Sequence, residues 1–232
     1  FMSRRVCLSR FDLVIFDCDG VLVDSEFVSI GREVKALHLL GWPIELDEAL
    51  ELFVGLSQKS ANEIIERKLG RPLPEDWGKQ LQAEVVEAFE TELVAIPGIA
   101  ECLDRLTLPR CVASSSLPAR IRRSLEITGL LPKLDPHLFS SSMVARGKPA
   151  PDLFLHAAAT LGHAPERCVV IEDSPAGVQA AVAAGMTPLG FTGGRHAGSE
   201  RWKQRLRNAG AEIVFGEMLR LPDLLDELQS GS

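Results

Sequence analysis

The chain has 232 residues, of which 46% are hydrophobic and 25% are charged, and its formal net charge is -7. This size and composition are typical of a globular protein with one large domain or two modest ones. The acidic balance argues against binding of nucleic acid or an anionic membrane through the overall field of the protein. An anionic ligand would therefore need a local group of donors.

Cysteine usage and hydropathy bear on the compartment. The cysteines are odd in number and dispersed along the chain. No apolar run approaches the roughly 20 residues of a membrane span, and no signal-peptide pattern opens the sequence. We therefore expect reduced thiols, no membrane partner and a cytoplasmic protein.

Short apolar runs alternate with helical stretches along most of the chain. The first expected strand covers residues 12–16 and ends in an acidic turn. Similar runs follow at 110–113, 138–140, 168–171 and 188–191. Helices are expected between them, each with proline near its first turn and glycine just after its end, at 118–128, 151–161 and 175–184, and a closing helix at 219–228. This alternation predicts a mostly parallel sheet covered by helices on both faces.

The segment from 26 to 91 interrupts that alternation. Apolar residues recur there at helical spacing over 28–40, 46–53, 60–69 and 75–89, without a convincing strand. We therefore predict a three-layer, Rossmann-like α/β core formed by residues 1–25 and 92–232. An all-helical cap, residues 26–91, is inserted directly after the first strand and its turn.

Two acidic residues, Asp17 and Asp19, follow the first expected strand. Their side chains should emerge at its carboxyl end, where open α/β sheets bind ligands. Two carboxylates one residue apart allow one to act as nucleophile or metal ligand and the other as acid and base. A solvated acidic turn is the alternative, since D-x-D-G also occurs in calcium loops.

Further polar residues follow the second and fourth expected strands. Ser114 and Ser115 end the second, where hydroxyl and amide groups suit a phosphoryl oxygen. Glu172 and Asp173 end the fourth and offer the oxygen ligands that Mg²⁺ prefers, or else an N-cap for the next helix. Lys148, in a loop just before a helix, could neutralise phosphate charge. Each signal is weak alone, but together they supply a nucleophile, an acid, a cation, phosphate donors and metal ligands.

The order of these motifs resembles one known family. The sequence contains D-x-D-G-x-x-x-D-S, then a serine, then K-P-x-P-D and E-D-S-x-x-G. This order resembles the haloacid dehalogenase superfamily over about residues 11–192. It is similar in particular to the branch that contains beta-phosphoglucomutase and small sugar-phosphate phosphatases, in which a helical cap follows the first motif.

The resemblance implies a role for each motif residue. Asp17 would attack phosphorus and form an aspartyl-phosphate, while Asp19 would protonate the leaving oxygen and then activate water. The resemblance also implies Mg²⁺ as cofactor, bound by the Asp17 carboxylate, the Asp19 backbone carbonyl and Asp173, with Glu172 in a supporting position. Ser114, the Ser115 amide and Lys148 would bind the phosphoryl oxygens.

The same resemblance separates related activities. The presence of Asp19 favours phosphoryl chemistry over carbon–halogen cleavage. Carbon–halogen cleavage releases no alkoxide leaving group and therefore needs no acid to protonate one. A mutase of the beta-phosphoglucomutase kind is the main alternative, and it characteristically carries a cap histidine and a cap arginine. Those positions hold Ser29 and Gln58 here, which favours hydrolysis. A non-catalytic phospholigand sensor is the second alternative, and the intact set of polar residues argues against it.

The substrate is expected to be a small phosphorylated metabolite, with a sugar phosphate or a phosphosugar acid as the first choice. Cap closure would exclude water, and the cap would present the selecting residues. By position, these are Glu26, Gly55, Gln58 and Lys59.

Other charged residues are weaker candidates. Arg120, Arg122 and Arg123 are expected to form a solvated helix face. Arg195 or His196, in a glycine-rich loop near the active-site edge, is a weak candidate for substrate contact. The oligomeric state is not readable from the sequence.

Overall fold

The structure, a computed structural model, describes residues 10–54 and 58–230. Its centre is a six-stranded sheet in the order β3-β2-β1-β4-β5-β6, and every neighbouring pair is parallel. The strands are β1 (Leu13–Phe16), β2 (Arg110–Ser114), β3 (Leu138–Ser140), β4 (Cys168–Glu172), β5 (Thr187–Phe191) and β6 (Ile213–Phe215).

Both faces of the sheet are buried. Val14 and Phe16 of β1 belong to one hydrophobic cluster, and Leu13 and Ile15 belong to another. A parallel sheet needs helices on both faces, because each strand sends apolar side chains to either side. The covering helices are α5 (Ile99–Arg105), α6 (Pro118–Ile127), α7 (Leu131–Leu134), α8 (Asp152–Leu161), α9 (Pro175–Ala183), α10 (Glu200–Ala209) and α11 (Leu221–Ser230), with short 3₁₀ turns at Ser141–Met143, Pro165–Arg167 and Met218–Arg220.

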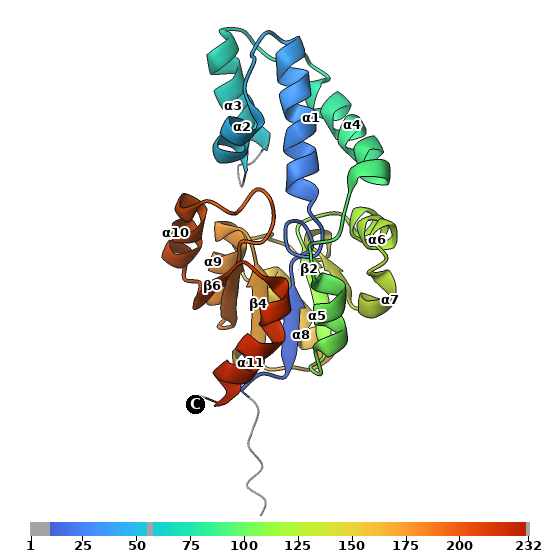
Figure 1. Cartoon of the computed structure of the whole chain (residues 1–232), viewed down its shortest axis with the longest axis vertical. Coiled ribbons are helices and arrows are strands. Elements are labelled where there is room, and N and C mark those ends of the chain that lie inside the picture. Colours follow the sequence, from blue (N-terminus) through green and yellow to red (C-terminus); the bar gives the residue numbers. More distant parts are fainter. Residues whose placement is uncertain (1–9, 55–57, 231–232) are drawn as a thin grey trace, which may run out of the picture.

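Four further helices gather at one end of the molecule, beyond the sheet (Figure 1). They are α1 (Ser25–Leu39), α2 (Leu46–Phe53), α3 (Gln58–Leu69) and α4 (Trp77–Glu92), and α1 packs against α2 and α4. The chain enters and leaves this segment side by side. The Asp24 amide donates to the Val94 carbonyl at 3.0 Å, and the Ile96 amide donates to the Leu22 carbonyl at 3.0 Å.

The expected fold class is confirmed, as are the five expected strands and the four expected core helices, which correspond to α6, α8, α9 and α11. The core helices α5, α7 and α10 were not predicted. The edge strand β6 was missed, because it has only three residues and two of them are only partly buried. The division into a core of 1–25 and 92–232 and a cap of 26–91 stays a prediction. The four helices concerned run from Ser25 to Glu92.

The structure bears on the cysteines and on the hydropathy of the helices. Cys18, Cys102, Cys111 and Cys168 are buried free thiols. Within the described part of the chain, no helix is both long and apolar enough to cross a bilayer.

Candidate active site

Three adjacent strands end at one edge of the sheet. β1 lies between β2 and β4 in the sheet. The chain continues from β1 to β2 and β3 on one side and later places β4, β5 and β6 on the other side. The strand order therefore reverses direction at β1, and this edge is a topological switch point. Asp17 directly follows β1, and its amide donates to the Ile171 carbonyl at 3.0 Å. Ser114 and Glu172 are the last residues of β2 and β4. The predicted polar residues are therefore brought together by strand order.

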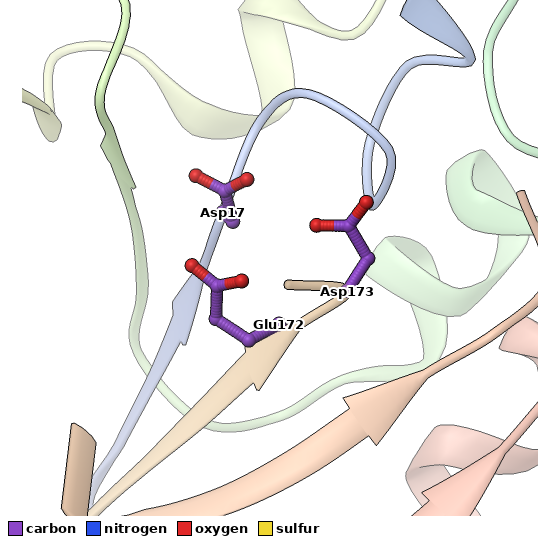
Figure 2. A group of neighbouring side chains, drawn as sticks. All are labelled: Asp17, Glu172 and Asp173. Atoms are coloured by element: carbon purple, nitrogen blue, oxygen red, sulfur yellow. The ribbon is translucent and has the colours of Figure 1, made fainter. Parts of the chain in front are cut away.

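Three carboxyl groups form the centre of this edge. Asp17, Glu172 and Asp173 are all buried, and one carboxylate oxygen of each lies within 4.8 Å of the others (Figure 2). Burial raises the pKa of Asp17 well above its ordinary value, and the neighbouring acids add to the shift while Lys148 opposes it. Such a group of hard oxygen ligands could hold a divalent metal ion.

Lys148 is the cation of this cluster. Its ammonium donates to Asp17 Oδ1 at 2.8 Å, to Glu172 Oε1 at 2.6 Å and to the Ala113 carbonyl at 3.0 Å. Only 5% of the side chain is exposed. Burial disfavours the charged lysine, but the two carboxylates outweigh burial and raise its pKa. Lys148 is therefore charged and holds one orientation of the Asp17 carboxylate.

Glu172 is fixed from its other side by the start of α9. Its Oε2 accepts hydrogen bonds from the Ser174 amide at 3.0 Å and the Ser174 hydroxyl at 2.9 Å. The Ser174 hydroxyl in turn accepts from the Gly177 amide and so provides the N-cap. A Cβ at Gly177 would lie 1.8 Å from Glu172 Oε1, so only glycine fits there. Asp173 is thus left free of the capping role.

Asp173 has two partners from the segment after β5. His196 Nε2 lies 2.7 Å from Asp173 Oδ2, and the Trp202 indole donates to the Asp173 carbonyl at 2.8 Å. The His196 side chain is fully buried. Burial lowers its pKa, but the bond to Asp173 and the charges of the neighbouring acidic residues together outweigh burial, and the net shift is upward. His196 therefore positions this carboxylate, which is a different contact from the expected one with substrate.

Asp19 is held by residues of α1 and by residues at and before the start of α6. Its carboxylate accepts from the Ser116 hydroxyl at 2.6 Å, from the Ser25 hydroxyl at 2.7 Å and from Arg120 Nη2 at 3.3 Å. Ser114 Oγ is farther away, at 3.5 Å. Burial alone would raise the pKa of Asp19, but Arg120 and the hydroxyl donors hold it below its ordinary value.

The expectation of a solvated face was wrong for Arg120. This side chain turns inward from α6, because Asp19 accepts its guanidinium and the Phe89 ring of α4 lies beneath it, 4.9 Å from the centroid. Arg122 and Arg123 are about half exposed, as expected. Arg120 thus bridges the sheet edge and the four-helix segment.

The structure gathers most of the predicted site residues around one cavity of about 320 Å³. Its lining includes Asp17, Asp19, Glu26, Ser114, Ser115, Lys148, Glu172 and Asp173, together with Ser116 and Arg120, which the sequence analysis did not select. Gly55 lies outside the described residues, and of Gln58 only the backbone at the start of α3 is described. Lys59 is exposed in the first turn of α3.

A second cavity of about 210 Å³ lies among the four helices and shares Glu26 and Arg120 with the first. It is also lined by Glu33, which is 6% exposed. Burial, with a smaller contribution from Glu26, raises the pKa of Glu33 to about 7.

This shift predicts a pH-dependent effect of Glu33→Gln on stability. The unfolded carboxyl, with a pKa near 4.5, loses its proton before the folded one, so Glu33 costs the wild type stability as pH rises from about 4.5 to 7. From pH 5 to pH 8, the unfolding free energy of the variant should therefore rise relative to wild type by about 1–3 kcal/mol. Urea denaturation at both pH values measures the change, with Glu63→Gln on exposed α3 surface as control. An equal difference at both pH values would contradict the buried, raised-pKa carboxyl.

Comparisons with known proteins agree with the geometry. Residues 11–185 match the family model of haloacid dehalogenase-like hydrolases. The 6-phosphogluconate phosphatase of Escherichia coli K12 is 32% identical over 190 residues, which cover 82% of this chain and 86% of the relative.

Two solved structures extend the similarity in three dimensions. A conserved haloacid dehalogenase-like protein from Agrobacterium tumefaciens has a TM-score of 0.89 at 40% identity, covering 94% of this chain and 99% of its own. A family hydrolase from Deinococcus radiodurans, crystallised with bound phosphate and sodium, has a TM-score of 0.82 at 34% identity, covering 94% and 96%. At this coverage the similarity includes the four-helix segment as well as the sheet.

Proposed function

Because the chain belongs to the haloacid dehalogenase-like hydrolase family, we propose that it is a Mg²⁺-dependent phosphatase that works through an aspartyl-phosphate on Asp17. The observation that carries the proposal is the buried Asp17 carboxylate, held by Lys148 beside Glu172 and Asp173. A named phosphatase among the relatives favours hydrolysis over the mutase alternative.

Asp17 is the nucleophile in this proposal. Its carboxylate must be ionised to attack phosphorus, although burial raises its pKa. The contact between Lys148 and Asp17 Oδ1 favours the ionised form and fixes the direction of attack. Lys148, Ser114 and the Ser115 amide would also bind the phosphoryl oxygens, offsetting repulsion between two anions.

The donor set fits a divalent cation. Asp17 and Glu172 share one buried lysine and Asp173 contacts His196, so the three carboxylates have an excess of negative charge that a hard cation would balance. Asp17, Asp173 and the Asp19 carbonyl would hold it, with Glu172 in support. When bound, Mg²⁺ supplies neutralisation of the cluster and polarisation of the phosphoryl group.

Asp19 is the proposed general acid and base. It stands two residues after the nucleophile, on the cavity wall, and its carboxylate is held by Ser25, Ser116 and Arg120. To protonate the leaving oxygen, Asp19 must pick up a proton and exchange one of these contacts for the substrate.

The helical segment is proposed as a cap that selects the substrate. Residues 26–91 would cover the core of 1–25 and 92–232, and Glu26 already lines the active-site cavity. The 6-phosphogluconate phosphatase relative supports a small sugar phosphate or phosphosugar acid as the substrate. Selecting roles for Gly55, Gln58 and Lys59 stay predictions.

Turnover of p-nitrophenyl phosphate with and without Mg²⁺ tests the proposal. We expect phosphate release with Mg²⁺ and its loss in EDTA, restored by added Mg²⁺. Activity that persists undiminished in EDTA would contradict the metal requirement. Phosphate binding without turnover of any phosphomonoester would favour the sensor. Conversion of beta-glucose 1-phosphate to glucose 6-phosphate with a bisphosphate primer would favour the mutase.

His196→Asn is expected to weaken metal binding. The variant loses the ring that contacts Asp173 Oδ2, so this carboxylate is no longer held in one orientation. Loss of such supporting contacts typically costs about 10–100-fold in metal affinity. The half-saturating Mg²⁺ concentration for p-nitrophenyl phosphate turnover should rise within that range. An unchanged Mg²⁺ requirement would contradict the positioning role. His163→Asn serves as the control, because His163 lines a separate cavity beside Arg110 at the start of β2.

A further inference from the structure

The cavity among the four helices lies directly beside the proposed phosphate site. Its walls come from all four helices, and two of its lining residues, Glu26 and Arg120, also line the active-site cavity. If a phosphoryl group binds at Asp17, the organic group attached to it lies next to this cavity. The cavity is therefore placed to receive the organic part of a phosphomonoester.

One stripe of α1 carries most of the polar lining. Glu26, Ser29, Ile30 and Glu33 follow one another at the spacing i, i+3, i+4 and i+7, so they lie on the same helix face. In α1 this face is the buried one, with Leu37 fully buried one turn further along. Two acidic residues thus occupy positions where a helix of this kind ordinarily carries apolar side chains.

Glu33 has a largely buried side chain whose carboxyl group opens on the cavity. The residue is 6% exposed and lines the cavity, and its carboxyl oxygens are not among the fully enclosed side-chain atoms that lack a partner. Polar groups in such surroundings nearly always have a hydrogen-bond partner, which is a protein group or water. The hydroxyl groups of a ligand in the cavity could supply that partner to Glu33.

The charges around the cavity restrict the ligand. A carboxylate would meet Glu26 and Glu33, and the guanidinium of Arg120 is already engaged by Asp19. Burial raises the pKa of both glutamates to about 7, so near neutral pH each carboxyl exists in both forms. Such groups can donate to and accept from hydroxyl groups, and Ser29 and Gln82 add uncharged polar partners.

We propose that this cavity binds the hydroxyl-bearing carbon chain of the substrate, with Glu33 and Glu26 bonding to its hydroxyl groups. The substrate class is then a hydroxyl-rich sugar or polyol phosphate without a carboxylate group, and phosphosugar acids are disfavoured. This inference rests on the proposed phosphatase function, which it narrows. In this inference, Glu33 is the residue of the cavity that determines substrate specificity.

Three phosphomonoesters test the inference: sorbitol 6-phosphate, 6-phosphogluconate and p-nitrophenyl phosphate. They offer a neutral polyol, a carboxylate and a tail without aliphatic hydroxyls. We expect wild-type kcat/KM for sorbitol 6-phosphate to exceed that for 6-phosphogluconate by about 10-fold or more, the size of one lost hydrogen bond to a charged group. A preference for 6-phosphogluconate would overturn the inference.

Glu33→Leu tests the residue itself, with Glu33→Gln as the conservative variant. In Glu33→Leu the ratio of kcat/KM for sorbitol 6-phosphate to that for p-nitrophenyl phosphate should fall about 10–100-fold, mainly through KM, because leucine cannot bond to a hydroxyl group. Glu33→Gln keeps a donor and an acceptor and should retain more of the ratio, and Glu63→Leu, on the exposed side of α3, should leave it unchanged. An unchanged ratio in a folded Glu33→Leu protein, with its fold checked by thermal melting, would overturn the inference.

Failure of the inference and failure of the proposed function give different results. If wild type shows no Mg²⁺-dependent turnover of p-nitrophenyl phosphate, the phosphatase proposal fails. If this turnover is present but the sorbitol 6-phosphate preference or its dependence on Glu33 is absent, only the assignment of the cavity fails.

Discussion

Asp17→Asn is expected to lower kcat for p-nitrophenyl phosphate by about 10⁴-fold or more, the scale seen when an enzymatic nucleophile is removed. An amide cannot form the acyl-phosphate, whereas the neighbouring groups that bind phosphate would remain. The variant should stay folded, because burial already favours an uncharged group at this position and an amide oxygen can still accept from Lys148.

The matched control is Asp226→Asn, which makes the same change on the exposed side of α11. It should retain full activity. Turnover by the Asp17→Asn protein within tenfold of wild type, measured on freshly purified protein in saturating Mg²⁺, would contradict the nucleophile assignment.

Lys148→Met is expected to have the largest effect on stability. The change leaves Asp17 and Glu172 buried without their shared cation. Breaking a buried ion pair by removing one partner typically costs about 3–5 kcal/mol, because an uncompensated charge remains in the interior. Urea denaturation at pH 7 in EDTA should show a loss of that size, and phosphatase activity should disappear as well.

A second substitution separates charge from packing. The double variant Lys148→Met with Glu172→Gln removes one of the two buried carboxylates that the single variant leaves without a cation. About 1 kcal/mol or more of the lost unfolding free energy should therefore be recovered. A loss below about 1 kcal/mol in the single variant would show that the buried lysine is not needed to compensate the two carboxylates.

Much of the site could be predicted because strand ends determine it. An apolar run followed by Asp17 places that residue at a sheet edge, and parallel pairing brings Ser114 and Glu172 to the same edge. The positions of these residues depend on the local sequence pattern of each strand and on the parallel pairing of the strands. Hydrophobic periodicity in the sequence predicts both.

Other contacts depend on side-chain direction, which local pattern does not give. Arg120 stands in a run of basic residues typical of a solvated helix face, yet it turns inward to Asp19 and Phe89. His196 reaches Asp173 from a loop after β5, and only the position of that loop near the sheet edge hinted at a role.

Glu33 was missed although a signal existed. At helical spacing it shares a face with Ile30 and Leu37, both buried, so an acidic residue there contradicts the pattern of its own helix. A polar residue that breaks an apolar stripe marks either an ion pair or a ligand site. The structure shows a cavity at that point and no protein partner among the described side chains.

The most direct test of the account is to trap the covalent intermediate. Wild-type protein is mixed with ³²P-labelled sorbitol 6-phosphate or acetyl phosphate and Mg²⁺, quenched in acid within one turnover and digested with pepsin at acid pH. The account predicts acid-stable, base-labile label on a peptide that contains Asp17, and no label in Asp17→Asn. Label on another peptide, or phosphate release with no labelled protein at any quench time, would contradict it.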